Sequence, residues 1–292
     1  MAIYTLLFST LLLPLFSILL LWRCPPKPRG RWIATLFMSF GVTAFSFFAA
    51  PWGWFGIPAR YLLALLFAVA LVLSLRRPPR EELREESPLR MIVKVLIGVM
   101  FGSVALGVLR AHSIPTGVLD VGFPLRGGSF LVQHGGSESA ANMHAVHPAQ
   151  RFGVDIVQLN GAGTRARGVY PNELDRYAVF GAQVLSPCDG TIVATRDGLP
   201  DLTPGTRDEK NKEGNHVVIR CFDANVTLAH LQRGSVAVRN GVKVAQGAPL
   251  GRVGNSGNTT EPHLHVHADR NGTGVPLLFG GEWLVRNDVV RR

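Results

Sequence analysis

The stretch Glu261-Pro262-His263-Leu264-His265-Val266-His267 decides how the second half of this chain is interpreted. It follows a glycine-rich run, 254–258, and Pro262 together with that run predicts a turn before a strand. On a strand, His263, His265 and His267 share one face. Imidazole is a common zinc ligand, although a row of solvated surface histidines would show the same pattern. The stretch therefore indicates a metal site only together with the rest of the chain.

Charge and apolar residues are distributed unevenly along the 292 residues, a length that suits about two domains. Residues 1–110 hold 12 Lys or Arg against 4 Glu, whereas residues 111–292 hold 18 against 16 acidic residues. The basic excess belongs to the apolar half, so no nucleic-acid partner is expected. We expect a membrane domain at 1–110, a linker at 111–128 and a β domain at 129–292.

Four apolar runs predict four transmembrane α-helices, at about 3–22, 32–50, 59–76 and 91–109. The first run lacks a basic start and a small-residue cleavage site, so we interpret it as a retained anchor. The first and third loops carry four and five Lys or Arg, whereas the second carries only Arg60. The positive-inside rule then places both termini outside. We expect a multi-pass protein of the cytoplasmic (inner) membrane, with its C-terminal domain in the periplasm or extracellular space.

Short strands separated by turns predict an all-β domain in the second half. The candidate strands are 129–133, 152–159, 183–186, 191–195, 216–222, 226–231 and 263–268. Two long polar connections, 160–181 and 196–214, are expected as loops that wall a cleft. Cys188 and Cys221 lie in this half, and the sequence leaves open whether they form a disulfide or two buried thiols.

Several spaced motifs in this half occur in the order of a known family. They are Ser186-Pro187-Cys188-Asp189-Gly190-Thr191, Gly214-Asn215-His216-Val217-Val218-Ile219, Thr227-Leu228-Ala229-His230-Leu231, Gly241-Val242-Lys243-Val244, Gly251-Arg252-Val253-Gly254-Asn255-Ser256-Gly257 and Pro262-His263-Leu264-His265. Together they resemble the lysostaphin-type (LytM-type) zinc metalloendopeptidases of bacterial cell walls, over most of residues 152–268. The resemblance implies a β-sheet core of the duplicated-hybrid-motif kind, with a groove that holds one Zn²⁺ per chain.

The resemblance also implies roles for individual residues. Asp155, in Gly153-Val154-Asp155-Ile156, and His265 would be zinc ligands. His263 would be the general base, and His230 a second catalytic histidine that steadies developing charge. His267 matches no ligand of the family, so we expect it at the rim of the site or beside a ligand.

One position departs from the family pattern. In the best-known members a histidine stands four residues before the aspartate, and here that position is Arg151, which has no lone pair to offer a metal. His144 and His147 lie just upstream. A subset of the family resembles this Asn-x-His, then Gln-Arg-aromatic, arrangement, so we expect His144 to be the first ligand, with His147 next. The remaining alternative is that both are exposed loop histidines.

The sequence thus predicts a membrane-tethered zinc metalloendopeptidase that hydrolyses peptide bonds of peptidoglycan outside the cytoplasmic membrane. The alternative is a catalytically inactive relative that binds wall peptides or regulates another cell-wall hydrolase. A third interpretation, a sensor of wall fragments, lacks an output domain in the cytoplasmic loops. The expected partners are a peptidoglycan peptide and the lipid bilayer, and no particular cell-wall protein is indicated.

Overall fold

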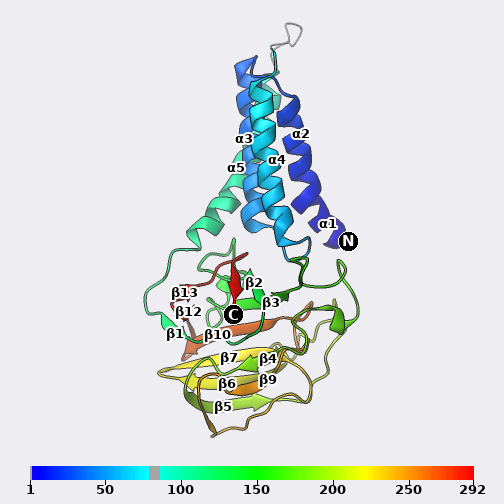
Figure 1. Cartoon of the computed structure of the whole chain (residues 1–292). Coiled ribbons are helices and arrows are strands. Elements are labelled where there is room, and N and C mark those ends of the chain that lie inside the picture. Colours follow the sequence, from blue (N-terminus) through cyan, green and yellow to red (C-terminus); the bar gives the residue numbers. More distant parts are fainter. Residues whose placement is uncertain (1, 79–85) are drawn as a thin grey trace. The chain divides into compact units, whose positions relative to one another are not determined.

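A computed structural model describes residues 2–78 and 86–292 of the chain (Figure 1). The chain divides into two compact units, and the boundary lies between Leu109 and Arg110. The first unit is helical and the second is mostly β, as the sequence predicts. This division follows from hydrophobic patterning, since long uninterrupted apolar runs form helices and short alternating runs form strands.

The N-terminal unit is built from long apolar helices. Its elements are α1 (Ala2–Leu7), the π-helical η1 (Phe8–Leu12), α2 (Leu13–Arg23), α3 (Arg29–Ala49), α4 (Ile57–Leu75) and α5 (Pro88–Arg110). The first three follow one another without a break. Among the described residues, four helical segments are long and apolar enough to cross a membrane: Ile3–Arg23, Arg29–Ala49, Ile57–Leu75 and Pro88–Arg110. Each lies within a few residues of a span expected from the sequence. Residues 79–85, in the arginine-rich third loop, lie outside the described residues.

Small and hydroxyl-bearing residues mediate contacts between these helices. A Cβ added to Gly41 in α3 would lie 2.9 Å from the Cα of Gly98 in α5, so only glycine fits at this crossing. Ser39 donates its hydroxyl to the carbonyl oxygen of Ser17 at 2.6 Å. Large apolar side chains such as Leu65 are exposed on the helices. Hydroxyls that bond across helices and large apolar side chains that face outward are features expected of helices in lipid.

One antiparallel sheet dominates the C-terminal unit, with the strand order β14-β2-β3-β10-β7-β6-β5-β8 and with β11 paired to β10. These strands are β2 (Ser129–His134), β3 (Val154–Leu159), β5 (Gly190–Arg196), β6 (Asn215–Cys221), β7 (Ala224–Leu231), β8 (Lys243–Val244), β10 (Leu264–Arg270), β11 (Thr273–Val275) and β14 (Val289–Arg291). The central strands β3, β10 and β7 are buried along most of their length. They form the rigid floor on which the site is built.

Smaller elements complete the unit. β1 (Leu119–Val121) pairs with β12 (Leu277–Phe279), which pairs with β13 (Glu282–Trp283), and β4 (Gln183–Leu185) pairs with β9 (Pro249–Arg252). The 3-10 helices are η2 (Met143–Val146) and η3 (Leu174–Arg176). The expectation of a separate linker at 111–128 differs from the structure, because β1 and Leu125 are packed in the core of the β unit. The strand that pairs with β1 lies near the C-terminus, so the local sequence does not reveal this pairing.

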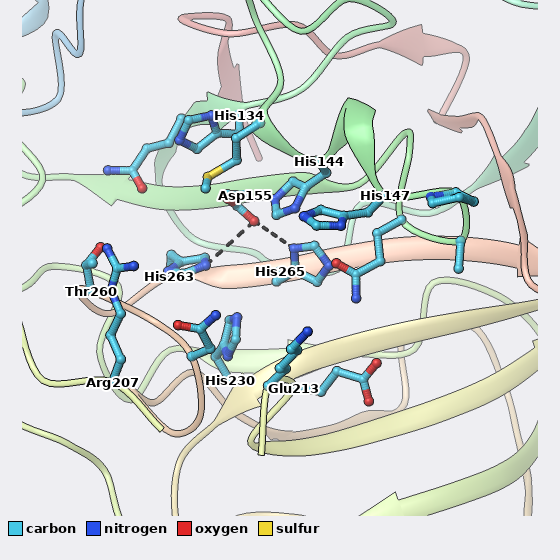
Figure 2. A pocket seen from close by; sticks show the side chains of 17 residues that line it. His134, His144, His147, Asp155, Arg207, Glu213, His230, Thr260, His263 and His265 are labelled. Atoms are coloured by element: carbon cyan, nitrogen blue, oxygen red, sulfur yellow. Dashed lines mark hydrogen bonds and ion pairs between the residues drawn. The ribbon is translucent and has the colours of Figure 1, made fainter. Parts of the chain in front are cut away.

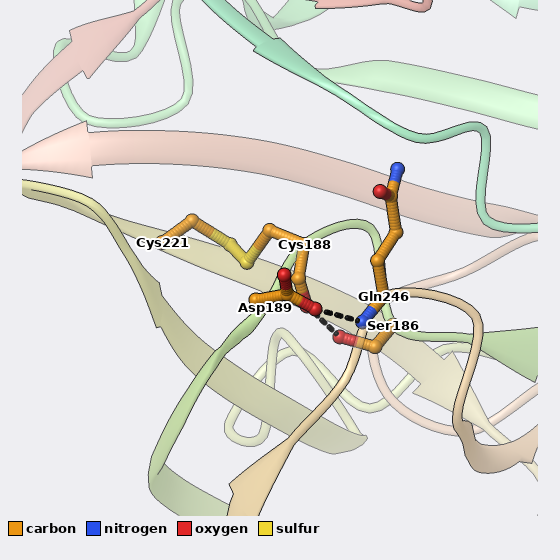
Figure 3. Close-up of a disulfide and its surroundings, with 5 residues drawn as sticks. All are labelled: Ser186, Cys188, Asp189, Cys221 and Gln246. Atoms are coloured by element: carbon orange, nitrogen blue, oxygen red, sulfur yellow. Dashed lines mark hydrogen bonds between the residues drawn. A yellow bond between two sulfur atoms is a disulfide. The ribbon is translucent and has the colours of Figure 1, made fainter.

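Cys188 and Cys221 form a disulfide, with their Cα atoms 5.9 Å apart (Figure 3). It joins the turn before β5 to the end of β6, and both cysteines are buried. Ser186 donates its hydroxyl to the carbonyl oxygen of Cys188 at 2.7 Å, which further orders this turn. Of the two states that the sequence leaves open for this pair, the structure has the disulfide.

Candidate metal centre

Strand register brings the chemically active side chains together on one face of the sheet. Asp155 of β3 stands directly opposite His265 of β10. A bulge in β2, between Val132 and His134, shifts the register so that His134 rather than Gln133 stands opposite Asp155. Bulges re-aim side chains in this way next to active sites. Because residues directly opposite each other share a face, His134, Asp155 and His265 form a row across three strands.

His144, Asp155 and His265 offer ligand atoms that all lie within 4.8 Å of one another. The Nε2 atom of His144 is 2.9 Å from Oδ2 of Asp155, and the Nδ1 atom of His265 is 2.7 Å from Oδ1 (Figure 2). Gly153 makes room for this approach, since a Cβ there would lie 2.9 Å from Cε1 of His265. Two imidazole nitrogens and one carboxylate match the ligand set of three-ligand zinc sites, which keep a fourth position open. The residues present therefore fit a zinc ion.

His144 reaches Asp155 because the chain folds back through η2. Asn142 caps this short helix: its side-chain oxygen accepts from the backbone N–H of His144 at 3.0 Å. Its amide nitrogen donates to the carbonyl oxygens of Gly136 and Gly153, both at 3.0 Å. The side chain is fully buried. Asn142 thus ties the loop that carries His144 to the strand that carries Asp155.

The structure separates the other two residues of this segment from the cluster. His147 lines the groove near His144, but it is not one of the three residues that converge. The guanidinium of Arg151 lies over the ring of Phe152, 5.4 Å from its centroid, and the residue is exposed. Arg151 therefore takes no part in the convergent group, whereas His144 does.

His263 and His230 lie beside the cluster with their tautomers fixed by backbone carbonyls. Carbonyl oxygen only accepts, so Nδ1 of His263 donates to Glu261 at 2.8 Å and Nδ1 of His230 donates to Ser256 at 2.9 Å. The two rings are 4.8 Å apart, and Nε2 of His263 is 3.6 Å from Oδ1 of Asp155. In the neutral state each ring has a bare Nε2. Both can accept a proton, and neither can donate from Nε2 until it gains one.

His267 contacts a candidate ligand and is not itself in the convergent group. Its Nδ1 is 3.0 Å from Nε2 of His265. If Nδ1 of His265 holds a metal, its proton resides on Nε2 and is donated to His267, which fixes the ring orientation. Burial lowers the pKa of His267 to about 2, so it remains a neutral acceptor. The structure thus puts His267 beside His265, a candidate ligand.

The cluster is the floor of a groove with a volume of about 420 Å³ (Figure 2). Burial opposes ionisation of Asp155, but the charges of His144 and His263 and hydrogen bonds from His144 and His265 hold its pKa well below the usual value. Burial would lower the pKa of His144, yet the neighbouring carboxylate raises it. Burial also lowers the pKa of His230 well below its usual value. The site therefore combines an ionised carboxylate with buried imidazoles, which favours a bound cation.

Sequence comparison agrees with the β fold and with part of this site. Residues 174–276 match peptidase family M23. The chain contains an M23 peptidase domain. The matched segment includes His230, His263 and His265, but it begins after His144 and Asp155. The assignment of those two residues as ligands therefore depends on the geometry of the structure and remains a prediction.

Two characterised relatives match the M23 domain. The chain is 33% identical over 108 residues to cell division protein DipM of Caulobacter vibrioides, which is 37% of this chain and 16% of that protein. It is 36% identical over 87 residues to peptidoglycan DD-endopeptidase ShyA of Vibrio cholerae, which is 28% of this chain and 20% of that protein. The chain thus spans a fifth or less of the length of either relative.

Solved structures of M23 peptidases are also similar to this chain. The catalytic domain of lysostaphin from Staphylococcus simulans is 21% identical, with a TM-score of 0.24 over 38% of this chain and 84% of that one. A putative M23 peptidase from Pseudomonas aeruginosa is 18% identical, with a TM-score of 0.33 over 66% of this chain and 61% of that one.

The structure adds residues to the M23 groove that the sequence does not single out. His134 and Gln133 line it from the end of β2. Behind them, Arg165 and Glu261 form a buried ion pair with Nη2 and Oε2 2.6 Å apart. No motif marks Gln133, His134 or Arg165, and Glu261 stands in the stretch 261–267 without a role that the sequence assigns. The one sequence signal for His134 is that it directly follows a predicted strand. The alternation of apolar and polar residues does not reveal a β-bulge.

Proposed function

We propose that this protein is a membrane-tethered zinc endopeptidase that cleaves peptide bonds of peptidoglycan outside the cytoplasmic membrane. The observation that carries the proposal is the convergence of His144, Asp155 and His265 on the floor of the groove. Two imidazoles and a carboxylate would hold one Zn²⁺ per chain through three protein ligands. The chemistry that a bound zinc supplies in such a site is polarisation of a carbonyl group and acidification of a water.

The remaining roles belong to His263 and His230. His263 would act as general base, because its Nδ1–H is donated to Glu261 and its Nε2 lone pair lies on the side of Asp155. A water proton accepted at Nε2 could then pass to the departing amine. His230 is the second histidine of this pair. It could stabilise negative charge only after protonation at Nε2, since its Nδ1–H is already donated to Ser256.

The substrate assignment rests on the family and on one relative. M23 peptidases are the family to which residues 174–276 match, and ShyA is described as a peptidoglycan DD-endopeptidase. The open groove, about 420 Å³ in volume, suits an extended peptide. Peptide bonds of peptidoglycan are therefore the substrate class that we propose.

Location outside the cytoplasm has two supports. The four apolar helices, with arginine-rich first and third loops, favour a membrane protein whose termini lie outside. The disulfide between Cys188 and Cys221 is of a kind that persists in oxidising compartments and is rare in the cytosol. Both observations favour a β unit in the periplasm or extracellular space.

The decisive experiment measures zinc content and hydrolysis of purified sacculi by the full chain in detergent. We expect one zinc per chain, and we expect Asp155→Ala, His265→Ala and His144→Ala each to lose it, because a three-ligand site rarely survives loss of a ligand. His147→Ala is the matched control, a histidine of the same groove outside the convergent group, and should retain the metal. If His147→Ala loses zinc and His144→Ala keeps it, the first ligand is His147.

The general base has its own test. His263→Ala should keep the zinc and lose about 10²- to 10⁴-fold in turnover, because a base acts on the water and does not hold the ion. If this variant loses its zinc, the roles of His263 and His265 are misassigned. A wild-type chain without metal would favour the alternative of an inactive relative that binds wall peptides.

A further inference from the structure

The groove contains a histidine whose protonation pattern is opposite to that of the expected catalytic pair. Nδ1 of His134 is 3.2 Å from Nη1 of Arg286. A guanidinium has no acceptor, so Nδ1 of His134 must accept this hydrogen bond. In the neutral ring the single proton then lies on Nε2. His134 is therefore a neutral ring with an N–H donor, whereas neutral His230 and His263 each have a bare Nε2.

Arg286 is held firmly enough to fix this tautomer. The same Nη1 also donates to the carbonyl oxygen of Gln133 at 3.0 Å. Burial lowers the pKa of Arg286 to about 10, which still leaves it charged at neutral pH. Because Nδ1 of His134 accepts from this guanidinium, it carries no proton, and a ring with its single proton on Nε2 is neutral.

The donor of His134 faces the groove. The side chain lines the same groove as the metal cluster, and its ring centroid is 6.2 Å from that of His144. Figure 2 shows His134 on the far side of Asp155 from His230. Within the described part of the chain, no hydrogen bond involves Nε2 of His134. This nitrogen is also absent from the buried side-chain atoms without a partner, so it is accessible. This N–H is therefore open to a ligand in the groove.

We propose that His134 donates its Nε2–H to the carbonyl oxygen of the bound peptide, with Arg286 as the positioning residue that fixes the tautomer. This inference rests on the proposed function of the groove. A donor that is already neutral and oriented needs no proton transfer to stabilise charge that develops on that oxygen. Neutral His230 does not offer such a donor from Nε2, so His134 takes the charge-stabilising role expected of His230.

The test uses the full chain in detergent and muropeptide dimers released from sacculi by a muramidase. Turnover is measured with the zinc-loaded protein, and binding with the zinc-free protein by calorimetry. For His134→Leu we expect unchanged zinc content, about 2- to 10-fold weaker binding, the range of one neutral hydrogen bond, and about 10²- to 10³-fold lower kcat, the range for a lost oxyanion donor. His134→Gln keeps an amide N–H near Nε2 and should recover most of both losses.

A matched control variant and a double-mutant cycle distinguish this role of His134 from a purely structural one. His112→Leu removes a half-exposed histidine of the same unit that does not line the groove, and should change neither quantity. In the pair His134→Leu and Arg286→Met, the double variant should lose no more kcat than His134→Leu alone, because Arg286 acts through His134. The ¹⁵N shifts of His134 should show an Nε2–H ring in the wild type and a mixture of tautomers in Arg286→Met.

The outcomes distinguish this inference from the proposed function. If the wild type binds muropeptides without turning them over, the peptidase assignment fails, while weaker binding by His134→Leu still supports the donor. If His134→Leu binds and turns over substrate as the wild type does, the donor is overturned. Loss of zinc from His134→Leu would also overturn it, since His134 would then be a ligand.

Discussion

Glu261→Gln tests whether a buried ion pair holds the wall of the groove. Nε of Arg165, in the long loop between β3 and β4, donates to both carboxylate oxygens of Glu261 at 2.7 Å. The two side chains are 0% and 5% exposed, and Gln133 donates to the same carboxylate at 2.8 Å. The backbone carbonyl of Glu261 also accepts the Nδ1–H of His263. The pair thus connects the loop, β2 and the predicted general base.

The expected magnitude follows from this burial. An amide at position 261 turns a donor toward the guanidinium and leaves a buried charge uncompensated, which costs about 3–5 kcal/mol. At about 1.36 kcal/mol per tenfold, the equilibrium constant for opening of this region should increase by about 10²- to 10⁴-fold. Hydrogen exchange of the full chain, followed by mass spectrometry, reads this equilibrium for peptides that cover the loop and β10.

A second glutamate provides the matched control. Glu282 pairs with Arg292 at 3.1 Å, but these side chains are 52% and 33% exposed. Glu282→Gln should therefore change exchange by less than about 1 kcal/mol, as surface pairs do. Peptides from α3 report whether either change spreads beyond the β unit. If Glu261→Gln accelerates exchange no more than Glu282→Gln does, the ion pair does not anchor the groove wall.

Three further predictions concern acid stability, the disulfide and topology. Unfolding of the zinc-free protein should become easier as pH falls below about 6.5, by about 1.4 kcal/mol per pH unit for each net proton taken up. The reason is that four histidines have lowered pKa values and must gain protons on unfolding: His134, His230, His265 and His267. Together they outweigh the opposite effect of His144, whose pKa is raised. A melting temperature that rises from pH 7 to pH 5 would contradict this sign. Replacing Cys188 and Cys221 with serine should lower the free energy of unfolding of the β unit by about 3–4 kcal/mol, because the disulfide joins residues 33 positions apart. The same exchange experiment measures this loss, and an unchanged exchange profile would argue against the disulfide. A reporter fused after Arg292 should be active only outside the cytoplasm, and activity restricted to the cytoplasm would reverse the topology.

Much of the fold could be predicted because its signals are local. The apolar runs gave all four helical segments, and short alternating runs gave β2 to β7 and β10 to within about two residues. The short strands β1, β8, β9 and β11 to β14 were not predicted. A run of two to four residues is too short for its alternation of apolar and polar residues to be recognised. Such strands form because a partner strand is already in place. The segment 111–128 looked like a linker for the same reason.

The sequence by itself determined the chemistry that is available: the residue types, the strand that presents His263 and His265, and the absence of a ligand at Arg151. Tertiary structure alone decided which atoms meet. His144 lies beside Asp155 because Asn142 folds η2 back onto β3, through hydrogen bonds to carbonyl groups on both sides of the loop. His134 enters the groove because a bulge shifts one strand by a residue, and its tautomer is set by Arg286 from a distant loop. These relations depend on register and on contacts between segments far apart in the chain, and no spacing of residues in the sequence encodes them locally.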